Sequence, residues 1–525
     1  MKISLTFNSQ PIDKLFVCEY LTSAEKKRRL KISMTRNCNS HTLSRRDFLK
    51  RTSSVALASS LAANSLGVMG LLNASEAFGN SNDYKALVFI FLNGGNDSFN
   101  MVVPMGAGPL RSNYELNRGV VSLTENSLHQ LDLGSSAKIY GDIGSSDFGL
   151  HNQCVDMAEM FNNQEMAILC NIGNLTAPIT RDQYLGNTGE SIELPPRLFS
   201  HSDQQRQFQS EPTGSFSYGW GGRLAEMLES YNNNPLVSPL ISLAGLNPFQ
   251  VTLQGEINPY ALGNNGIVPL NRFSGARSTM VTNYMTSIDT SSHLMAQKYS
   301  DIFGSATVAQ DIIESAFSTA ESSGVDFDGI FSAAGVADDS TIGKRLKTVA
   351  KMIKGRSAEA NKRPIYFVEM NGFDTHANML PNHSSQMTEL NAAIKAFRDT
   401  LYEQGDYDNV LSYVGSEFAR TLTPNGNDAN ASGTDHGWSG NALAFGGMVD
   451  GGKFFGTYPD LLINQGLDVG GRGRFIPTHS SSQCSAVIAN WMGASQSNIS
   501  QIFPSLNNFP SPFDESVNIN FIKSS

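Results

Sequence analysis

The stretch PIYFVEMNGFDTHANM, residues 364–379, joins a continuous apolar run to a polar segment with an aspartate and a histidine two positions apart. The run PIYFVEM predicts a strand that is covered on both faces. In open α/β sheets ligands bind where strands end, because loops and helix amino termini converge there. Asp374 and His376 therefore predict either half of a metal site or an ordinary turn in which Asp374 caps the next helix.

Five more apolar runs predict strands, and helical patterns separate them. The other strands are expected at ALVFIFL (86–92), MAILCNI (166–172), PLISLA (239–244), NVLSYVG (409–415) and ALAFGG (442–447). Helices are expected at 152–162, 219–231, 279–302, 307–321, 341–355, 384–403 and 482–493. Strands that alternate with helices predict an α/β fold with a mainly parallel central sheet and helices on both faces.

The amino-terminal residues 1–77 are typical of an export signal rather than of a folded domain. SRRDFLK (44–50) places paired arginines before a weakly apolar stretch rich in Ala, Ser and Gly, which resembles a twin-arginine signal. Asn64, Gly67 and Gly70 interrupt that stretch, so a lasting membrane span is not expected. The alternative is an amphipathic helix that stays attached.

Cleavage is expected after Ala77. The twin-arginine export machinery is an expected partner, which would carry the protein to the periplasm or beyond it. Residues 1–33 are unusual for a signal, and Met34 offers a more typical start. Residues 78–525 are predicted to form a single α/β domain. Within it, the span from about 258 to 345 is rich in Ser, Ala, Asp and Thr, which predicts a mostly helical insertion or a solvated spacer.

The exported part of the chain is acidic. The whole chain has a net charge of −10, and residues 1–77 carry 12 Lys and Arg against 5 Asp and Glu, which leaves −17 for the rest. This charge argues against nucleic acid or an anionic membrane as a main partner. Cys154, Cys170 and Cys484 remain after removal of the signal, and one disulfide among them would be allowed in an oxidising compartment.

Carboxylates and imidazoles follow three of the predicted strands, and a further pair follows the flexible loop expected at 422–434. The residues are Asp97 in GGND, Asp374 and His376, Glu417 in SEFAR, and Asp435 and His436 in TDHG, and Arg420 lies beside Glu417 in SEFAR. Such a mixture of oxygen and nitrogen donors suits Zn, Mn or Mg, and two ions would suit a displacement at phosphorus or sulfur. Taken alone, each motif has an ordinary structural explanation. Asp97 could be a turn residue, and Glu417 could form an ion pair with Arg420 in a first helical turn.

Seven motifs together resemble the exported family called domain of unknown function 1501. They are LVFIFLNGGNDSFNMVVP (87–104), LFSHSDQQ (198–205), YGWGGRLAE (218–226), GFDTHANM (372–379), GSEFART (415–421), GTDHGWSGNALAFGG (433–447) and GRGRFIPTHSSSQ (471–483). The family in turn looks like a distant relative of the alkaline phosphatase and sulfatase superfamily. That resemblance implies metal ligands in the order Asp97, Asp374, His376, Glu417 and His436.

This sequence departs from the superfamily pattern at three points. Asp374 and His376 stand closer together than in the phosphatases, and Glu417 lacks the histidine that commonly follows it. TAPITR (176–181) does not match the C/S-x-P-x-R motif of sulfatases, which argues against a formylglycine enzyme. Thr176 or Ser200 would then supply a nucleophilic hydroxyl, although each is also explained as a cap or turn residue.

The remaining catalytic candidates are His201, Asp203 and Arg420. His201 and Asp203 would serve as extra ligands or as general acid and base, and Arg420 would clamp an anionic oxygen. The sequence thus predicts an exported metal-dependent hydrolase that acts on phosphate or sulfate esters, either small molecules or polymers that bear them. The alternative is a non-catalytic envelope protein that retains the fold and uses these carboxylates for packing or binding.

Overall fold

A nine-stranded sheet organises the chain, in the order β11-β5-β10-β9-β1-β8-β6-β7 with β12 beside β5. The computed structural model describes residues 83–524, apart from 134–135, 144–146, 214–216, 233–236, 256, 268–273, 290–291 and 358–359. The strands are β1 (Ala86–Asn93), β5 (Met166–Gly173), β6 (Leu240–Ser242), β7 (Tyr260–Ala261), β8 (Ile365–Asn371), β9 (Val410–Gly415), β10 (Gly440–Phe445), β11 (Phe454–Gly456) and β12 (His479–Ser480). Only β10 among them is antiparallel to its neighbours, β9 and β5, so the predicted α/β fold with a mainly parallel sheet is confirmed.

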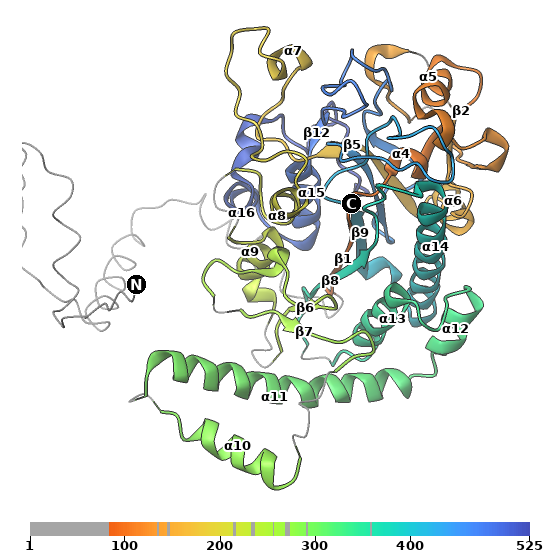
Figure 1. Cartoon of the computed structure of the whole chain (residues 1–525). Helices are drawn as coiled ribbons and strands as arrows, with labels where there is room; N and C mark the ends of the chain where they lie inside the picture. The colour runs from red at the N-terminus through yellow and green to blue at the C-terminus, as the bar shows by residue number, and fades with distance from the viewer. Residues whose placement is uncertain are drawn as a thin grey trace, which may run out of the picture. The chain divides into compact units, whose positions relative to one another are not determined.

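Helices cover both faces of this sheet (Figure 1). Alternate residues of β1 enter different cores, with Val88 and Ile90 on one face and Phe89 and Phe91 on the other. The first face packs against α5 (Pro109–Arg118), α6 (Val155–Asn162), α11 (Leu294–Glu321), α12 (Phe327–Ala333), α13 (Thr341–Lys354) and α14 (Met379–Gln404). The second packs against α8 (His201–Gln209), α9 (Trp220–Met227), α15 (Ser481–Met492) and α16 (Gln496–Ile502).

Three short strands form a separate antiparallel sheet near the first face. Its order is β2 (Val102–Met105), β4 (Asp147–Leu150) and β3 (His129–Gln130). The four-residue helices α4 (Ser98–Met101) and α7 (Arg181–Tyr184) complete the described α-helices together with α10 (Ala276–Thr286). Apart from α10, which overlaps the helix predicted at 279–302, these elements are too short for a hydrophobic period to reveal them, and the sequence did not predict them.

The helical span before β8 differs in detail from the prediction. Helices were expected at 279–302 and 307–321, whereas the chain breaks earlier, between α10 and α11. His293 is the residue at which α11 starts, because its side chain accepts a hydrogen bond from the Met295 N–H and so caps the helix. The strand β7 also lies inside the span that was predicted to be mostly helical, together with α10, α11, α12 and the first residues of α13.

Three further expectations concern the thiols, the membrane and the signal. Cys154, Cys170 and Cys484 are free and buried, so the disulfide that the sequence allowed does not form in this structure. Within the described ranges, no helix is both long enough and apolar enough to cross a membrane. The twin-arginine motif, the cleavage site after Ala77 and the alternative start at Met34 lie outside the described residues.

His151 and His383 form a buried pair beneath the carboxyl edge of the sheet, with ring centroids 5.3 Å apart. Burial lowers the pKa of each to about 3. Unfolded histidines take up protons below about pH 6.5, so the unfolded chain binds more protons between these values and stability falls as the pH falls. Each histidine contributes up to about 1.4 kcal/mol per pH unit.

We therefore expect the melting temperature of the protein to fall as the pH is lowered from 7 to 4. Replacing His383 with glutamine should flatten this dependence, because the amide cannot take up a proton on unfolding. The variant His293→Asn, which removes an exposed imidazole and keeps a side chain that can cap α11, is the control and should keep the wild-type slope. Equal slopes for wild type and His383→Gln would contradict the assignment.

Candidate metal centre at the carboxyl edge of the sheet

Four segments meet at one edge of the sheet: the ends of β1, β8 and β9, and the residues that precede β10. The segment before β10 reaches this edge because β10 is antiparallel, so its start lies beside the end of β9. Backbone pairing fixes the segments further, since Ala377 pairs with Ser432 and Arg420 pairs with His436. Side chains that are far apart in the sequence are thereby held within a few ångströms of one another.

Gly94 allows the β1 loop to approach the β8 loop closely. Its φ is +119°, and an added Cβ would lie 2.5 Å from the backbone nitrogen of Asp374. Any other residue would push the two loops apart or strain the backbone. The glycine of the GGND motif therefore serves the position of Asp374.

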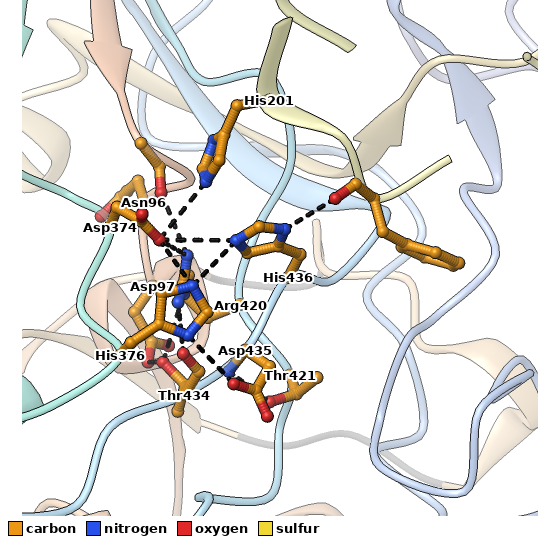
Figure 2. Close-up of polar contacts among 12 residues, drawn as sticks. Asn96, Asp97, His201, Asp374, His376, Arg420, Thr421, Thr434, Asp435 and His436 are labelled. Carbon is orange, nitrogen blue, oxygen red and sulfur yellow. Dashed lines mark hydrogen bonds and ion pairs between the residues drawn. The ribbon is translucent and has the colours of Figure 1, made fainter. Parts of the chain in front are cut away.

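Asp374 lies at the middle of three imidazoles, as Figure 2 shows. Its Oδ1 is 3.0 Å from His376 Nε2, 3.3 Å from His201 Nε2 and 3.5 Å from His436 Nε2. The Nε2 atoms of His376 and His436 are 2.9 Å apart. Ligand atoms of His201, Asp374 and His436 all lie within 4.8 Å of one another, and His376 adjoins two of these three residues.

The opposite nitrogen of each imidazole is held by an oxygen. His201 Nδ1 lies 2.8 Å from Glu417 Oε1, and His376 Nδ1 lies 3.0 Å from Asp435 Oδ1. The Nδ1 of His436 lies 2.6 Å from the carbonyl oxygen of Phe199. Because carboxylates and carbonyls only accept hydrogen bonds, each Nδ1 carries the proton and donates it.

A neutral histidine with its proton on Nδ1 presents a lone pair on Nε2, so the three lone pairs face the Asp374 carboxylate. His201 Nε2 is buried and has no hydrogen-bond partner among the described residues. Two lone pairs at 2.9 Å, as on His376 and His436, require a proton or a metal cation between them. The separations between Asp374 Oδ1 and the three Nε2 atoms, and between the Nε2 atoms of His376 and His436, run from 2.9 to 3.5 Å. They bracket the roughly 3.3 Å between neighbouring ligands of a tetrahedral ion with bonds of about 2.0 Å. The donor set therefore fits a divalent cation.

The electrostatics of the centre differ from one ligand to the next. The hydrogen bond from His201 to Glu417 raises the pKa of His201, against the effect of partial burial. Burial lowers the pKa of His436. Burial alone would raise the pKa of Asp374, but the Arg420 guanidinium outweighs it and holds the pKa below its usual value. Asp374 is thus ionised and His436 neutral near pH 7, as metal ligands must be.

Arg420 lies directly behind Asp374 and is fully buried. Its NH1 donates to Asp374 Oδ1 at 2.7 Å and to the Gly94 carbonyl at 3.2 Å, and its NH2 donates to the Thr434 carbonyl. The first-turn ion pair with Glu417 that the sequence allowed is not present, because the residues after β9 are not helical and Arg420 pairs with Asp374 instead.

Two residues predicted as ligands lie outside the first layer of the centre. Asp97 is fully buried and pairs with Arg118 at 2.8 Å. The Thr434 hydroxyl links it to Arg420, since it donates to Asp97 Oδ2 and accepts from Arg420 Nε, both at 3.4 Å. Glu417 is buried as well and faces His201 rather than Asp374, while its Oε1 also accepts the Gly94 N–H. The structure therefore brings Asp374, His376 and His436 together and places Asp97 and Glu417 one layer behind.

The two predicted hydroxyl nucleophiles, Thr176 and Ser200, have different hydrogen-bond acceptors. Thr176 is buried, and its hydroxyl donates to the Glu193 carbonyl, which cannot serve as a general base. Ser200 precedes His201 at the start of α8 and donates to Asp203 Oδ2 at 2.7 Å instead of capping the helix. Of the two predicted nucleophiles, Ser200 is therefore the one that adjoins a residue of the centre, His201, in the chain.

Sequence reasoning missed the supports contributed by the GRGR motif at 471–474. Arg472 donates to Asp435, which in turn holds His376. Arg474 donates from Nε to the carbonyl oxygen of His436 at 2.9 Å. The available signal was the repeated Gly-Arg pair in a motif that the family resemblance had singled out.

Glu417 offers a test of the outer layer. Replacing it with glutamine removes the negative charge that holds the Nδ1 proton of His201, and outer-shell changes of this kind weaken metal binding by about 10 to 100-fold. We expect Glu417→Gln to lower the zinc affinity to this extent in a titration with a competing chelator. Glu403→Gln, on the exposed face of α14, is the control, and equal affinities for both variants would contradict the assigned role.

The comparison with protein families decides the membership of this chain. The family described as "Protein of unknown function (DUF1501)" matches residues 84–465. The chain belongs to the DUF1501 family. This range contains all four residues of the candidate centre, and it confirms the resemblance that the motifs predicted. No curated protein matches the DUF1501 chain.

Solved structures similar to this DUF1501 protein share little sequence with it. Ps i-CgsB in complex with k-i-k-neocarrahexaose has 10% identity and a TM-score of 0.29, and the match covers 82% of this chain and 77% of that one. A mutant of the alkaline phosphatase PafA has 10% identity and a TM-score of 0.21, with 64% and 63% covered. Any activity of the DUF1501 protein has to be argued from its own residues.

Proposed function

We propose that this DUF1501 protein is an exported, metal-dependent hydrolase of phosphate or sulfate esters or of a similar anionic group. The observation that carries the proposal is the convergence of three Nε2 lone pairs on the ionised carboxylate of Asp374, each imidazole being oriented by an acceptor on its far side. Export through the twin-arginine route, to the periplasm, rests on the SRRDFLK segment at 44–50.

His201, Asp374 and His436 would hold the ion, and His376, which adjoins Asp374 and His436, would supply a fourth ligand. Three imidazoles and one carboxylate favour Zn or Mn over Mg, which prefers oxygen ligands. In the described part of the chain no second group of three or more such side chains gathers, which supports one ion rather than two. A bound divalent ion acts as a Lewis acid toward a phosphoryl or sulfuryl oxygen.

The residues around the ion would supply orientation and charge. Arg420 keeps Asp374 ionised, so the carboxylate is available to the ion at all pH values at which the histidines are neutral. Ser200 is the candidate nucleophile, because its hydroxyl donates to a carboxylate that can accept the proton, and it adjoins His201 in the chain. Asp203 is then the candidate general base.

The test is ester hydrolysis by the purified exported chain after addition of Zn, Mn or Mg. We expect turnover of p-nitrophenyl phosphate or p-nitrophenyl sulfate that requires the metal, disappears in His436→Ala and persists in the exposed-histidine control His293→Ala. A metal-loaded protein that turns over neither ester, and that keeps its melting temperature in excess chelator, would overturn the proposal and favour the non-catalytic envelope protein.

A further inference from the structure

Three of the four arginines at the centre have their donors occupied by the protein. Arg118 bonds Asp97, Asn100 and two backbone carbonyls. Arg420 bonds Asp374, Gly94 and Thr434. Arg472 bonds Asp435, Thr423 and the Pro424 carbonyl. These three guanidinium groups are structural supports with little capacity for a further ligand.

Arg474 differs from the other three. Its Nε donates to the His436 carbonyl at 2.9 Å, and its guanidinium lies 4.5 Å from the centroid of the Phe199 ring. Neither terminal nitrogen bonds another residue in the described part of the chain, and no carboxylate pairs with Arg474 there. The side chain is half-buried. Its guanidinium is therefore held in place while its two terminal nitrogens keep their hydrogen-bonding capacity.

The two anchors of Arg474 tie it to the centre. His436 presents its Nε2 to Asp374, and Phe199 holds the other nitrogen of the same imidazole through its carbonyl. A guanidinium fixed by stacking and by one hydrogen bond loses little conformational entropy when it binds an anion. One free N–H group on each terminal nitrogen forms a planar fork that matches the oxygens of a sulfate, phosphate or carboxylate.

We infer that Arg474 binds a second negative group of the substrate, so that the centre selects esters that carry at least two anionic groups. The inference rests on the proposed function for the identity of the first group, which would be the ester at the metal. The exported chain has a net charge of −17, so an isolated anion is repelled at long range and a local cation without a carboxylate partner has a large effect on which anions bind.

The experiment compares the metal-loaded wild type with Arg474→Gln on a monosulfated and a disulfated disaccharide of the same sugar sequence, and on the matched phosphates. The quantity measured is the ratio of kcat/KM for the doubly charged substrate to that for the singly charged one. We expect Arg474→Gln to lower this ratio by about 10-fold or more, the loss typical of one charge-assisted hydrogen bond. Arg474→Lys, which keeps the charge but loses the fork, should give an intermediate ratio.

Arg277→Gln is the matched control, because it removes the same charge from an exposed position on α10. Rates are divided by metal content, since Arg474 also contacts His436. A ratio in Arg474→Gln equal to that of the control would overturn the inference and leave the proposed hydrolase standing. If wild type hydrolyses none of the esters, calorimetric binding of the same disaccharides decides. A preference for the disulfated sugar that Arg474→Gln removes would then support the inference although the proposed hydrolase had failed, and equal binding by both proteins would overturn it.

Discussion

Replacing Asp374 with alanine is expected to remove stoichiometric metal from the protein. The carboxylate is the one anionic donor that touches all three imidazoles, and it offsets the positive charge of both the ion and Arg420. Outer-shell partners are worth about 10 to 100-fold in metal affinity, so loss of this direct donor should cost more than about 100-fold. The measurement is a zinc titration against a competing chelator.

The control must separate loss of a ligand from loss of structure. Asp374→Asn keeps an oxygen that Arg420 can bond while removing the charge, so it should fold normally and still bind zinc weakly. Asp328→Ala removes a carboxylate whose side chain is 81% exposed and which pairs with Lys347, and it should bind zinc as wild type does. Wild-type zinc affinity in Asp374→Ala would exclude this carboxylate from the centre.

Replacing Asp97 with alanine is expected to destabilise the fold without removing a direct metal ligand. Asp97 and Arg118 are both 0% exposed, and removal of one partner leaves a buried charge unpaired. Breaking a buried pair costs about 3 to 5 kcal/mol. With an unfolding entropy of about 2 cal/mol/K per residue, this corresponds to a fall of roughly 3 to 5 °C in the melting temperature of a chain of this length.

The double variant Asp97→Ala/Arg118→Met shows whether the unpaired charge is the cause. Methionine removes the guanidinium and fills part of its volume, so the double variant should be more stable than Asp97→Ala alone. Zinc affinity measured on the folded Asp97→Ala protein should stay within a few-fold of wild type. A loss of zinc as large as that in Asp374→Ala would show that Asp97 is a ligand, as the sequence first predicted.

Much of the fold could be predicted from the sequence because the central strands are buried on both faces. Their apolar runs are continuous, and six of the nine strands of the sheet were located within a few residues from them alone. Short elements such as β11 and β12 carry no periodic signal, since two or three residues gain their pairing only from neighbours already in place. The break between α10 and α11 depended on a cap at His293, which the apolar pattern does not reveal.

The candidate site was predicted in part. The rule that ligands gather where strands end selected Asp374 and His376, and the motif after the flexible loop added His436. The structure brings these three together. The same rule selected Asp97 and Glu417, but it cannot distinguish a ligand from the residue behind it, because both follow a strand directly. Arg118 lies on α5, and no sequence pattern links it to Asp97. The ion pair that occupies Asp97 was therefore visible only in the structure.

His201 was named as a candidate from the sequence, but its role could not be decided there. It opens α8 after a long loop, and only the tertiary structure brings its Nε2 to Asp374. Sequence reasoning left it between an extra ligand and a general acid or base. The hydrogen bond to Glu417 favours the role of ligand, because it fixes the proton on Nδ1 and leaves Nε2 free.

The most direct test of a metal centre is the metal content of the wild-type protein. The exported chain, purified without chelator, would be analysed by inductively coupled plasma mass spectrometry beside His436→Ala and the control His293→Ala. The centre described here predicts about one divalent ion per chain in wild type and in the control, and far less in His436→Ala. Wild-type protein that holds no stoichiometric metal, and that acquires none after incubation with zinc or manganese, would contradict it.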